Sequence, residues 1–370
     1  MVLEKEKQRA ALGFFTDFSA RKAASCRLSL NGAFLPAESR IFSSAAATAA
    51  AALALSCADT RLLENNLGQL GFGDFYTAGF DSDDPERVGT ALACRIRDGA
   101  LETAVVMRGS EGREWLSNFD IGFMAEHRGF SRATDFAEQK LMDYIFTRTI
   151  GLEPRFFVCG YSRGGAAANI LAKRLCDRYG TDRVWAYTVA SPATTVSRRS
   201  ARYDSIFNLI RNEDIFTRLP LSGWGYIRYG RDIPLSVRGD ISERYRTLCG
   251  EDYLGFTQQA PVDRALYALM NLAPHVQAYY GRRRMVGGKR LSLYEFMTDI
   301  AMRLADEPDE NAADIFMSAM VSDYADLVSF LSGGADLMEL LSPTCAIPRC
   351  SVTDSHSPAA YMAAMQLYQG

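Results

Sequence analysis

Residues 155–173 read RFFVCGYSRGGAAANILAK, and this stretch decides the fold of the chain. Phe156–Val158 predicts a short apolar strand, and Ala166–Leu175 predicts a helix of mostly small residues without a breaker. Between them, Gly160–Gly164 is a G-x-S-x-G pattern, which is typical of a serine at a tight turn from strand to helix. Glycines flank the serine because a Cβ would clash where the strand and the helix approach closely. We therefore predict that Ser162 is a nucleophile at the start of a helix, where backbone N–H groups point at the reaction centre.

The overall composition is that of an ordinary globular protein. The chain has 370 residues, 48% of them hydrophobic and 23% charged, which suits one large domain with an insertion, or two domains. The formal net charge is -3, which offers no electrostatic case for binding nucleic acid. We therefore expect no nucleic-acid partner.

Cysteine, histidine and carboxylate residues are not spaced as metal ligands. The eight cysteines lack zinc-ligand pairing, and Asp and Glu do not cluster with His or Cys, so we predict no metal and no cofactor. Cys345 and Cys350 are close enough in sequence to bridge in an oxidising compartment. Several of the others lie in apolar runs, which favours buried free thiols and a reducing environment.

The sequence carries no signal for membrane insertion. Residues 1–15 have charges spread through them and no apolar core of a signal peptide, so we expect a cytoplasmic protein, with secretion as the open alternative. The alanine-rich run Ala45–Leu55 is too short and too weakly apolar to cross a bilayer and indicates a packed helix. We expect no transmembrane segment.

Hydrophobic periodicity and turn signals outline the other elements. Residues 1–40 indicate an irregular lead-in, and residues 40–67 predict one helix with Ser43 or Ser44 as its N-cap. Two strands are predicted within 87–107, joined by a turn at Asp98-Gly99. The remaining expected elements are a helix over 133–149 and strands over 183–189, 205–210 and 225–230.

The order of these elements indicates the fold class. The alternation of strand, helix and strand through 155–190 predicts an α/β fold, a parallel or mixed sheet with helices on its faces. From 237 to 345, apolar residues recur at helical spacing and no strand is evident. We predict a core over 1–236, a helical insertion or cap over 237–345, and a return to the core over 346–370.

A serine nucleophile needs a base, and the base needs an acid to orient it. The chain has three histidines, and the chain order of serine, acid and histidine leaves His275 or His356. His275 lies inside the helical insertion. His356 lies in a polar segment before a terminal helix, where a loop would present it. We therefore predict His356 as the base.

The acid is expected just beyond the carboxyl end of a strand. Asp214 fits, because it follows the strand predicted over 205–210. Asp354 is only two residues from the base and would not easily reach the far ring nitrogen, while Glu213 and Asp232 are weaker candidates. For Asp214, a role in capping a turn is the alternative.

The oxyanion that develops on the substrate needs hydrogen-bond donors. One donor is predicted to be the backbone N–H of Arg163, directly after the nucleophile. The other is predicted at Ser110, just past the strand Thr103–Met107, where both its N–H and its hydroxyl would be able to donate. A plain polar turn is the alternative for Ser110.

Several motifs, in this order along the chain, together resemble the class 3 (fungal-type) lipase family and its bacterial relatives. They are Arg108-Gly109-Ser110, Trp115–Asn118, His127–Phe130, Gly160–Gly165, Ala190-Ser191-Pro192, Arg211–Pro220 and His356–Tyr361. The resemblance covers residues 85–236 and 350–365 and implies an α/β-hydrolase-like fold. The stretch between acid and base is longer here than in the minimal layout of the family.

The resemblance implies a role for each matching residue. Ser162 looks like the nucleophile, Asp214 like the acid and His356 like the base. Ser110 and Arg163 look like the oxyanion hole.

Three further residues are candidates for substrate binding. The segment Glu111–Ile121 lies where the family carries its lid, so its aromatic residues Trp115 and Phe119 would cover the site. Tyr161, which stands where the family more often has a histidine, is the third candidate. Ordinary packing under a loop is the alternative for the two lid aromatics. His127 matches a residue that is structural in the family.

The residues and the resemblance together predict a serine hydrolase that cleaves carboxylic esters of lipids, an acylglycerol lipase or esterase. Its partners would be a lipid or small ester substrate and, transiently, a lipid surface. The alternatives are a phospholipase, an acyltransferase or a peptidase that uses the same serine, and a binding protein that keeps the fold without the activity.

Overall fold

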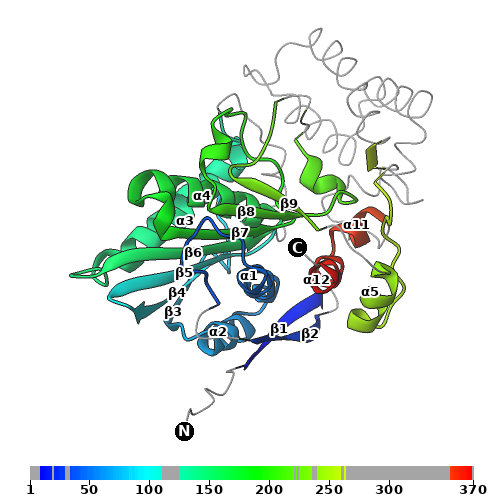
Figure 1. The fold of residues 1–370 in the computed structure, drawn as a ribbon, viewed down its shortest axis with the longest axis horizontal. Coiled ribbons are helices and arrows are strands. Elements are labelled where there is room, and N and C mark those ends of the chain that lie inside the picture. Colours follow the sequence, from blue (N-terminus) through cyan, green and yellow to red (C-terminus); the bar gives the residue numbers. More distant parts are fainter. Residues whose placement is uncertain are drawn as a thin grey trace.

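The computed structural model contains a central sheet with helices packed on both of its faces (Figure 1). It describes residues 9–18, 21–29, 34–82, 84, 86–110, 125–220, 222, 225–235, 240–259, 262–263 and 351–368. Within these ranges, no helix is long and apolar enough to cross a membrane.

The central sheet has seven strands whose spatial order follows the chain. They are β3 (Gly73–Ala78), β4 (Thr90–Arg97), β5 (Ala100–Met107), β6 (Glu153–Tyr161), β7 (Val184–Val189), β8 (Ile206–Ile210) and β9 (Arg231–Pro234). The first two pairs are antiparallel and the rest are parallel, so the sheet is mixed, as predicted. Together with the helices on its faces, this is the predicted α/β fold with a mixed sheet.

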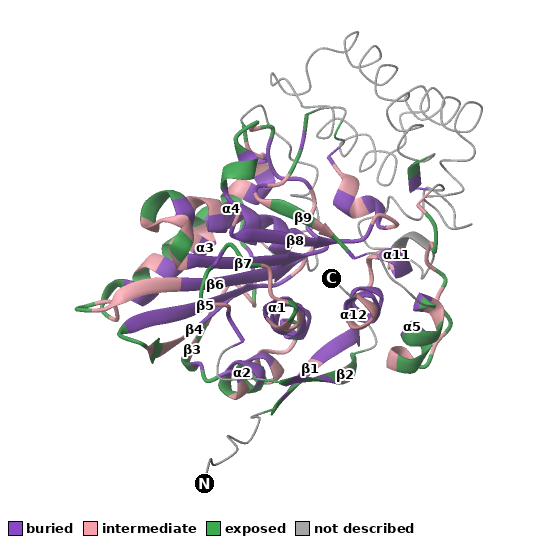
Figure 2. Ribbon diagram, viewed as in Figure 1, coloured by how far each residue is buried: buried purple, intermediate pink, exposed green. Residues whose placement is uncertain are grey.

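Different helices cover the two faces of the sheet. On one face, α3 (Arg128–Phe146) and α4 (Arg163–Tyr179) bury side chains that include Val105, Phe156 and Val158. On the other face, α1 (Ser44–Ser56) packs against β6 and β7. Figure 2 shows that the central strands β5, β7 and β8 are buried between these layers, whereas the edge strands β3 and β9 are partly exposed. Burial on both faces explains why the central parallel strands are nearly continuous apolar runs.

The helix predicted over 40–67 is two helices, α1 and α2 (Thr60–Gln69), so the single-helix prediction was wrong. The chain breaks between them because the Asp59 side chain accepts hydrogen bonds from the backbone N–H groups of Arg61 and Leu62, which starts a new helix. Ser43 caps α1 through the N–H of Ala46, in agreement with the predicted N-cap.

The irregular lead-in predicted for residues 1–40 is also wrong, because it contains an antiparallel hairpin of β1 (Arg9–Asp17) and β2 (Lys22–Ser29). The outer edge of β1 is bonded by a side chain from α2. The Asn66 amide accepts from Gly13 N at 3.0 Å and donates to Gly13 O at 2.7 Å, in place of a neighbouring strand. This bonding ties the hairpin to the helical layer beside the sheet.

Replacing Asn66 by alanine is expected to lower the free energy of unfolding by about 2–3 kcal/mol, because it leaves the two backbone groups of Gly13 without their partners. Urea unfolding measures the change. Gln69→Ala is the matched control, since Gln69 makes one exposed bond, to the N–H of Ala11, and should cost less than about 1 kcal/mol. Equal losses in the two variants would contradict this account of the β1 edge.

The predicted strand over 225–230 is not a strand. Ile227 forms an isolated bridge with Thr195, and the pairing with β8 is made four residues later by β9. Helix α3 begins at Arg128, earlier than the predicted residue 133, because His127 acts as its N-cap. The turn at Asp98-Gly99 is as predicted, and both residues have positive φ.

The end of the chain returns to the core as two short helices. They are α11 (Ser351–His356) and α12 (Pro358–Leu367), and Ser357 caps the second of them. His356 is therefore the last residue of a helix, not a loop residue. In the part of the chain that the structure describes, 3-10 helices include Thr181–Arg183, Ser200–Arg202 and Ile215–Arg218.

Part of the predicted insertion packs on the core. Helix α5 (Ile241–Cys249) lies against α12, where Tyr245 meets Ala359 and Ala360. Residues 264–350, which include His275, Cys345 and Cys350, lie outside the described residues, so the division into core and cap stays a prediction. Of the described cysteines, Cys26, Cys57, Cys159 and Cys176 are buried free thiols and Cys94 and Cys249 are partly buried free thiols.

Candidate active site

The serine turn sits between the end of β6 and the first residue of α4. Ser162 has φ 55 and ψ -124, a conformation that is costly for a residue with a side chain and that is held by the surrounding structure. The neighbouring glycines allow the close approach. A Cβ on Gly160 would lie 2.3 Å from Gly164 O, and a Cβ on Gly164 would lie 2.3 Å from Arg108 O. The G-x-S-x-G pattern is thus explained by backbone contacts on both sides of the serine.

The structure brings together the three side chains predicted as nucleophile, acid and base. Nε2 of His356 lies 2.9 Å from the hydroxyl oxygen of Ser162, and Nδ1 of His356 lies 2.7 Å from Oδ2 of Asp214. Both distances are within hydrogen-bond range, although Asp214 and His356 are 142 positions apart. Because a carboxylate only accepts, Nδ1 carries the proton and Nε2 is left to accept from Ser162.

Asp214 is fully buried, and both of its carboxylate oxygens are hydrogen-bonded. Oδ1 accepts from Phe216 N at 3.0 Å, so the residue also caps the 3-10 helix that follows. Oδ2 accepts from the Tyr361 hydroxyl at 2.7 Å as well as from His356. Burial, and then the Asp214 charge, raise the pKa of Tyr361 well above its usual value, so the phenol stays protonated and donates. Asp214 therefore has both predicted roles: it caps the following turn and it bonds to the base.

Replacing Tyr361 by phenylalanine is expected to lower kcat/KM on the order of tenfold. The change removes one donor to a buried carboxylate, a bond worth about 1.5–3 kcal/mol, and only part of that acts on the imidazolium formed in the reaction. Steady-state kinetics on a soluble ester measure the effect.

Tyr187→Phe serves as the control, because Tyr187 is another buried tyrosine whose hydroxyl accepts from Ser43 N, away from the triad. It should lose stability without losing activity per folded molecule. Equal kinetics in the Tyr361→Phe variant and the unmodified protein would show that Asp214 does not depend on the phenol.

Tyr161, predicted to bind substrate, makes its contacts with the protein. Its side chain is 5% exposed, and its hydroxyl donates to the backbone carbonyl of His356. Burial raises the pKa of this phenol well above its usual value, which keeps it a donor. The structure therefore favours a role in positioning His356. Trp115 and Phe119, the other two candidates, lie outside the described residues.

The residues predicted to hold the oxyanion lie on two sides of the serine turn. Arg163 is the first residue of α4, so its N–H is at the positive end of the helix. The turn 108–110 follows β5 and packs against the serine turn, since a Cβ on Gly109 would lie 3.1 Å from the ring of Tyr161. Ser110, the last residue of that turn, is half-buried. The two predicted donors thus come from segments that contact each other.

The competing residues are engaged elsewhere. His127 is fully buried, stacks on Phe130 at 3.9 Å and caps α3, so it is structural, as predicted. Asp232 pairs with Arg228 at 2.7 Å. Asp354 accepts from the backbone N–H of Leu254 at 2.8 Å.

Two functional neighbours of the triad were missed by the sequence reasoning. In the sequence, Tyr361 is only the last residue of the motif His356–Tyr361, and Arg211 is only the first residue of Arg211–Pro220. Arg211 is 2% exposed and donates to the carbonyl of Ser355, the residue before the base, at 3.0 Å. The sequence signal for Arg211 was its position directly after an apolar strand and two residues before Glu213.

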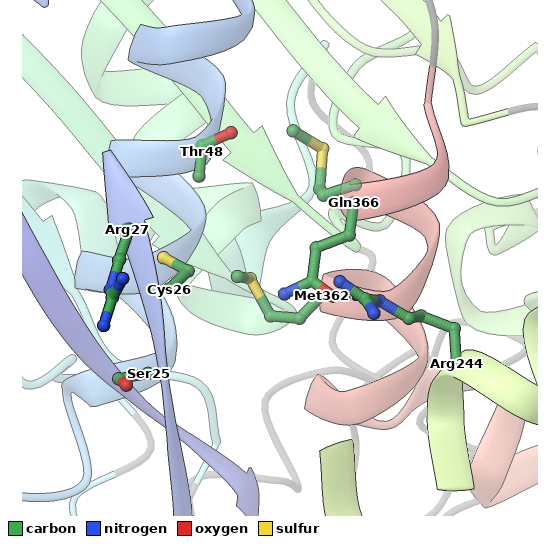
Figure 3. A pocket seen from close by; sticks show the side chains of 8 residues that line it. Ser25, Cys26, Arg27, Thr48, Arg244, Met362 and Gln366 are labelled. Carbon is green, nitrogen blue, oxygen red and sulfur yellow. Dashed lines mark hydrogen bonds between the residues drawn. The ribbon is translucent and has the colours of Figure 1, made fainter. Parts of the chain in front are cut away.

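A cavity of about 380 Å³ lies away from this site, between β2, α1, α5 and α12 (Figure 3). Cys26, Arg27, Arg244 and Met362 are among its lining residues, and none of the triad side chains is. It is therefore not the place where the triad would meet a substrate. Among the described residues, no group of three or more His, Cys, Asp or Glu side chains could hold a metal ion.

Part of the chain is similar to known lipases. Residues 104–224 match the family described as Lipase (class 3). The Rhizomucor miehei triacylglyceride lipase structure is 18% identical with a TM-score of 0.41, over 51% of this chain and 78% of that chain. A lipase from Rhizopus microsporus var. chinensis is 17% identical with a TM-score of 0.40, over 55% and 80%. Lipase II from Rhizopus niveus is 14% identical with a TM-score of 0.38, over 50% and 78%. No curated protein sequence matches the chain.

Proposed function

We propose that this chain, whose residues 104–224 carry a class 3 lipase match, is a serine hydrolase that cleaves the carboxylic esters of lipids. The observation that carries the proposal is the relay from Ser162 through His356 to Asp214, with separations of 2.9 and 2.7 Å. A nucleophile, a base that contacts it and an acid that orients the base are the parts that acyl transfer needs.

The reaction follows from the order of these bonds. His356 takes the proton of the Ser162 hydroxyl at Nε2 as the oxygen attacks the ester carbonyl carbon. Asp214 stabilises the imidazolium that forms, and the base then returns the proton to the departing alcohol. In the second half, His356 takes a proton from water as the water oxygen attacks the acyl carbon. The base then returns that proton to the Ser162 oxygen as its bond to the acyl group breaks and the carboxylic acid leaves. Each half of the reaction thus uses one proton transfer through His356.

The developing oxyanion is held, in this proposal, by the N–H of Arg163 and by Ser110. The first position of a helix supplies a donor that is already oriented, so no reorganisation is needed during the reaction. Loss of one such donor typically costs about 3–4 kcal/mol in the barrier. The packing of the turn 108–110 on the serine turn supports this pairing of donors.

A transient contact with a lipid surface belongs to the same proposal. Its support is the composition of residues 111–121, where Trp115, Leu116, Phe119 and Ile121 stand between β5 and α3. Aromatic and aliphatic side chains in such a segment would enter the interface of a lipid particle while the rest of the chain stays in water. No observation favours a phospholipase or an acyltransferase over an ester hydrolase.

The test is a panel of p-nitrophenyl esters of increasing chain length, with emulsified triacylglycerol, combined with labelling by a fluorophosphonate. We expect turnover of esters and a single label on the peptide that contains Ser162. Adding an alcohol acceptor separates hydrolysis from acyl transfer by the product formed. A folded protein that neither turns over any ester nor takes up the label would overturn the proposal.

A further inference from the structure

Residues 253–256, which follow α5, are bonded directly to the two residues before the base. The N–H of Leu254 donates to Asp354 Oδ2 at 2.8 Å, and the N–H of Phe256 donates to Ser355 Oγ at 2.8 Å. Asp354 is 2% exposed and Ser355 is fully buried. These two bonds join a segment beyond the lipase match to the helix that ends at His356.

Arg211 closes this arrangement from the end of β8. Its guanidinium donates to the carbonyl of Ser355 at 3.0 Å and to the carbonyl of Phe256 at 3.5 Å. The Phe256 carbonyl also accepts from the hydroxyl of Tyr253 at 3.2 Å. One buried cation therefore contacts both sides of the junction, three residues from the triad acid. We call residues 253–256 with Arg211, Asp354 and Ser355 the clasp.

The base needs such support because its own helix is short. Helix α11 has six residues, and a helix of that length is not stable without tertiary contacts. The clasp holds the backbone on the N-terminal side of His356. On the C-terminal side, Tyr161 donates to the His356 carbonyl and Ser357 caps the next helix. The main chain of the base is thus bonded on both sides.

We propose that Asp354 and Ser355 are positioning residues, which hold His356 in line with Ser162 and Asp214 through their bonds to residues 253–256. The inference rests on the proposed hydrolase function. It assigns a part in the reaction to a segment that lies outside the lipase match at 104–224. A displacement of the imidazole by about 1 Å is enough to cost on the order of a hundredfold in rate, so the main chain beside the base has to be held.

The charged and titratable groups around His356 come from four elements or the residues directly after them. Tyr161 lies on β6; Arg211, Glu213 and Asp214 follow β8; Asp354 and Tyr361 belong to α11 and α12. Because Asp354 is itself charged, its effect as a charge has to be separated from its effect as a hydrogen-bond acceptor. Two substitutions do this, since asparagine keeps an acceptor oxygen and alanine keeps neither the charge nor the acceptor.

The experiment compares Asp354→Ala and Asp354→Asn in the full chain, with kcat counted per active site titrated by a fluorophosphonate. For Asp354→Ala we expect kcat to fall on the order of tenfold with KM changed less than about twofold. The pH profile of kcat/KM should also change, because the bond from Nδ1–H to Asp214 that orients the base is weakened. Asp354→Asn should return to within about threefold of the unmodified rate. Equal losses in both variants, or an unchanged pH profile in Asp354→Ala, would overturn the proposal.

Two further measurements guard against trivial outcomes. Asn66→Ala is the matched control. It also removes a buried polar side chain that bonds to the backbone, but Asn66 bonds to Gly13 at the edge of β1 and not to the residues beside His356. It should lower stability without moving the pH profile. Ser355→Ala removes the second bond of the clasp without changing any charge. It should change the pH profile of kcat/KM in the same direction as Asp354→Ala does.

A readout that does not depend on hydrolysis separates this inference from the proposed function. The chain has three histidines, so the imidazole signals can be assigned by nuclear magnetic resonance with a His356→Ala variant as reference. In Asp354→Ala, the Nδ1–H proton signal of His356 should move upfield, because its bond to Asp214 is weaker, whether or not an ester is turned over. An unchanged proton signal would refute the clasp even in an active hydrolase. A changed signal in a protein without esterase activity would leave the clasp standing and refute the hydrolase.

Discussion

Replacing Ser162 by alanine is expected to lower ester hydrolysis by a factor of about 10⁴–10⁶, because the proposed acyl-enzyme forms on the hydroxyl that is removed. The residual rate would come from the remaining donors and from substrate binding. The fold should persist, since alanine is no worse than serine at φ 55, and the serine side chain makes no capping bond to α4. The measurement is the initial rate on a soluble ester, with thermal unfolding followed on the same samples.

Ser191→Ala is the matched control for this result. Ser191 is a fully buried serine near the same turn, and its hydroxyl donates to the carbonyl of Pro192 at 2.9 Å. That variant should keep its activity within about threefold, since a neutral hydrogen bond is worth about 1 kcal/mol or less of stability. A Ser162→Ala protein that retained more than a few per cent of the rate would place the nucleophile elsewhere.

Replacing Gly164 by alanine should lower the free energy of unfolding by about 3–5 kcal/mol or prevent folding, one of the largest effects expected of a single methyl group. The added Cβ would meet Arg108 O at 2.3 Å and Met107 O at 2.5 Å. Both are backbone atoms at the end of a central strand, so relief requires β5 and α4 to separate. Urea unfolding measures the loss, and any folded fraction should show reduced activity because the turn 108–110 would shift.

Gly68→Ala separates this steric effect from the general consequence of replacing glycine. Gly68 lies inside α2, and a Cβ there would meet nothing within 4 Å. That change should raise stability by about 0.5–1 kcal/mol, because alanine loses less backbone freedom in a helix. Opposite signs in the two variants are the expected result. A Gly164→Ala variant as stable as the unmodified protein would refute the close packing of the serine turn against β5.

The amino-acid sequence alone determined the elements whose cause lies within a few neighbouring residues. The glycines at 160 and 164 predicted the serine turn, Asp98-Gly99 predicted the hairpin turn, and the pair Ser43 and Ser44 predicted the N-cap of α1, which is Ser43. In each case the local residues restrict the backbone or satisfy it directly, so the prediction needs no knowledge of distant segments.

The hairpin at 9–29 and the break between α1 and α2 could not be read in this way. The edge of β1 is completed by Asn66, a residue 53 positions away from Gly13, and the hairpin is buried against helices that follow it in the chain. An isolated two-stranded hairpin is at best marginally stable in water, so its local sequence is a weak signal.

For the candidate site, too, the sequence predicted some features and the tertiary structure decided the others. Residue types and their order along the chain were enough to single out Ser162, Asp214 and His356. Whether they meet, and which groups hold them, was decided only by the tertiary structure. Hydrogen bonds between residues more than 140 positions apart leave no pattern in a single sequence. The contacts of Tyr361, Arg211 and residues 253–256 with the site are therefore seen only in the folded structure.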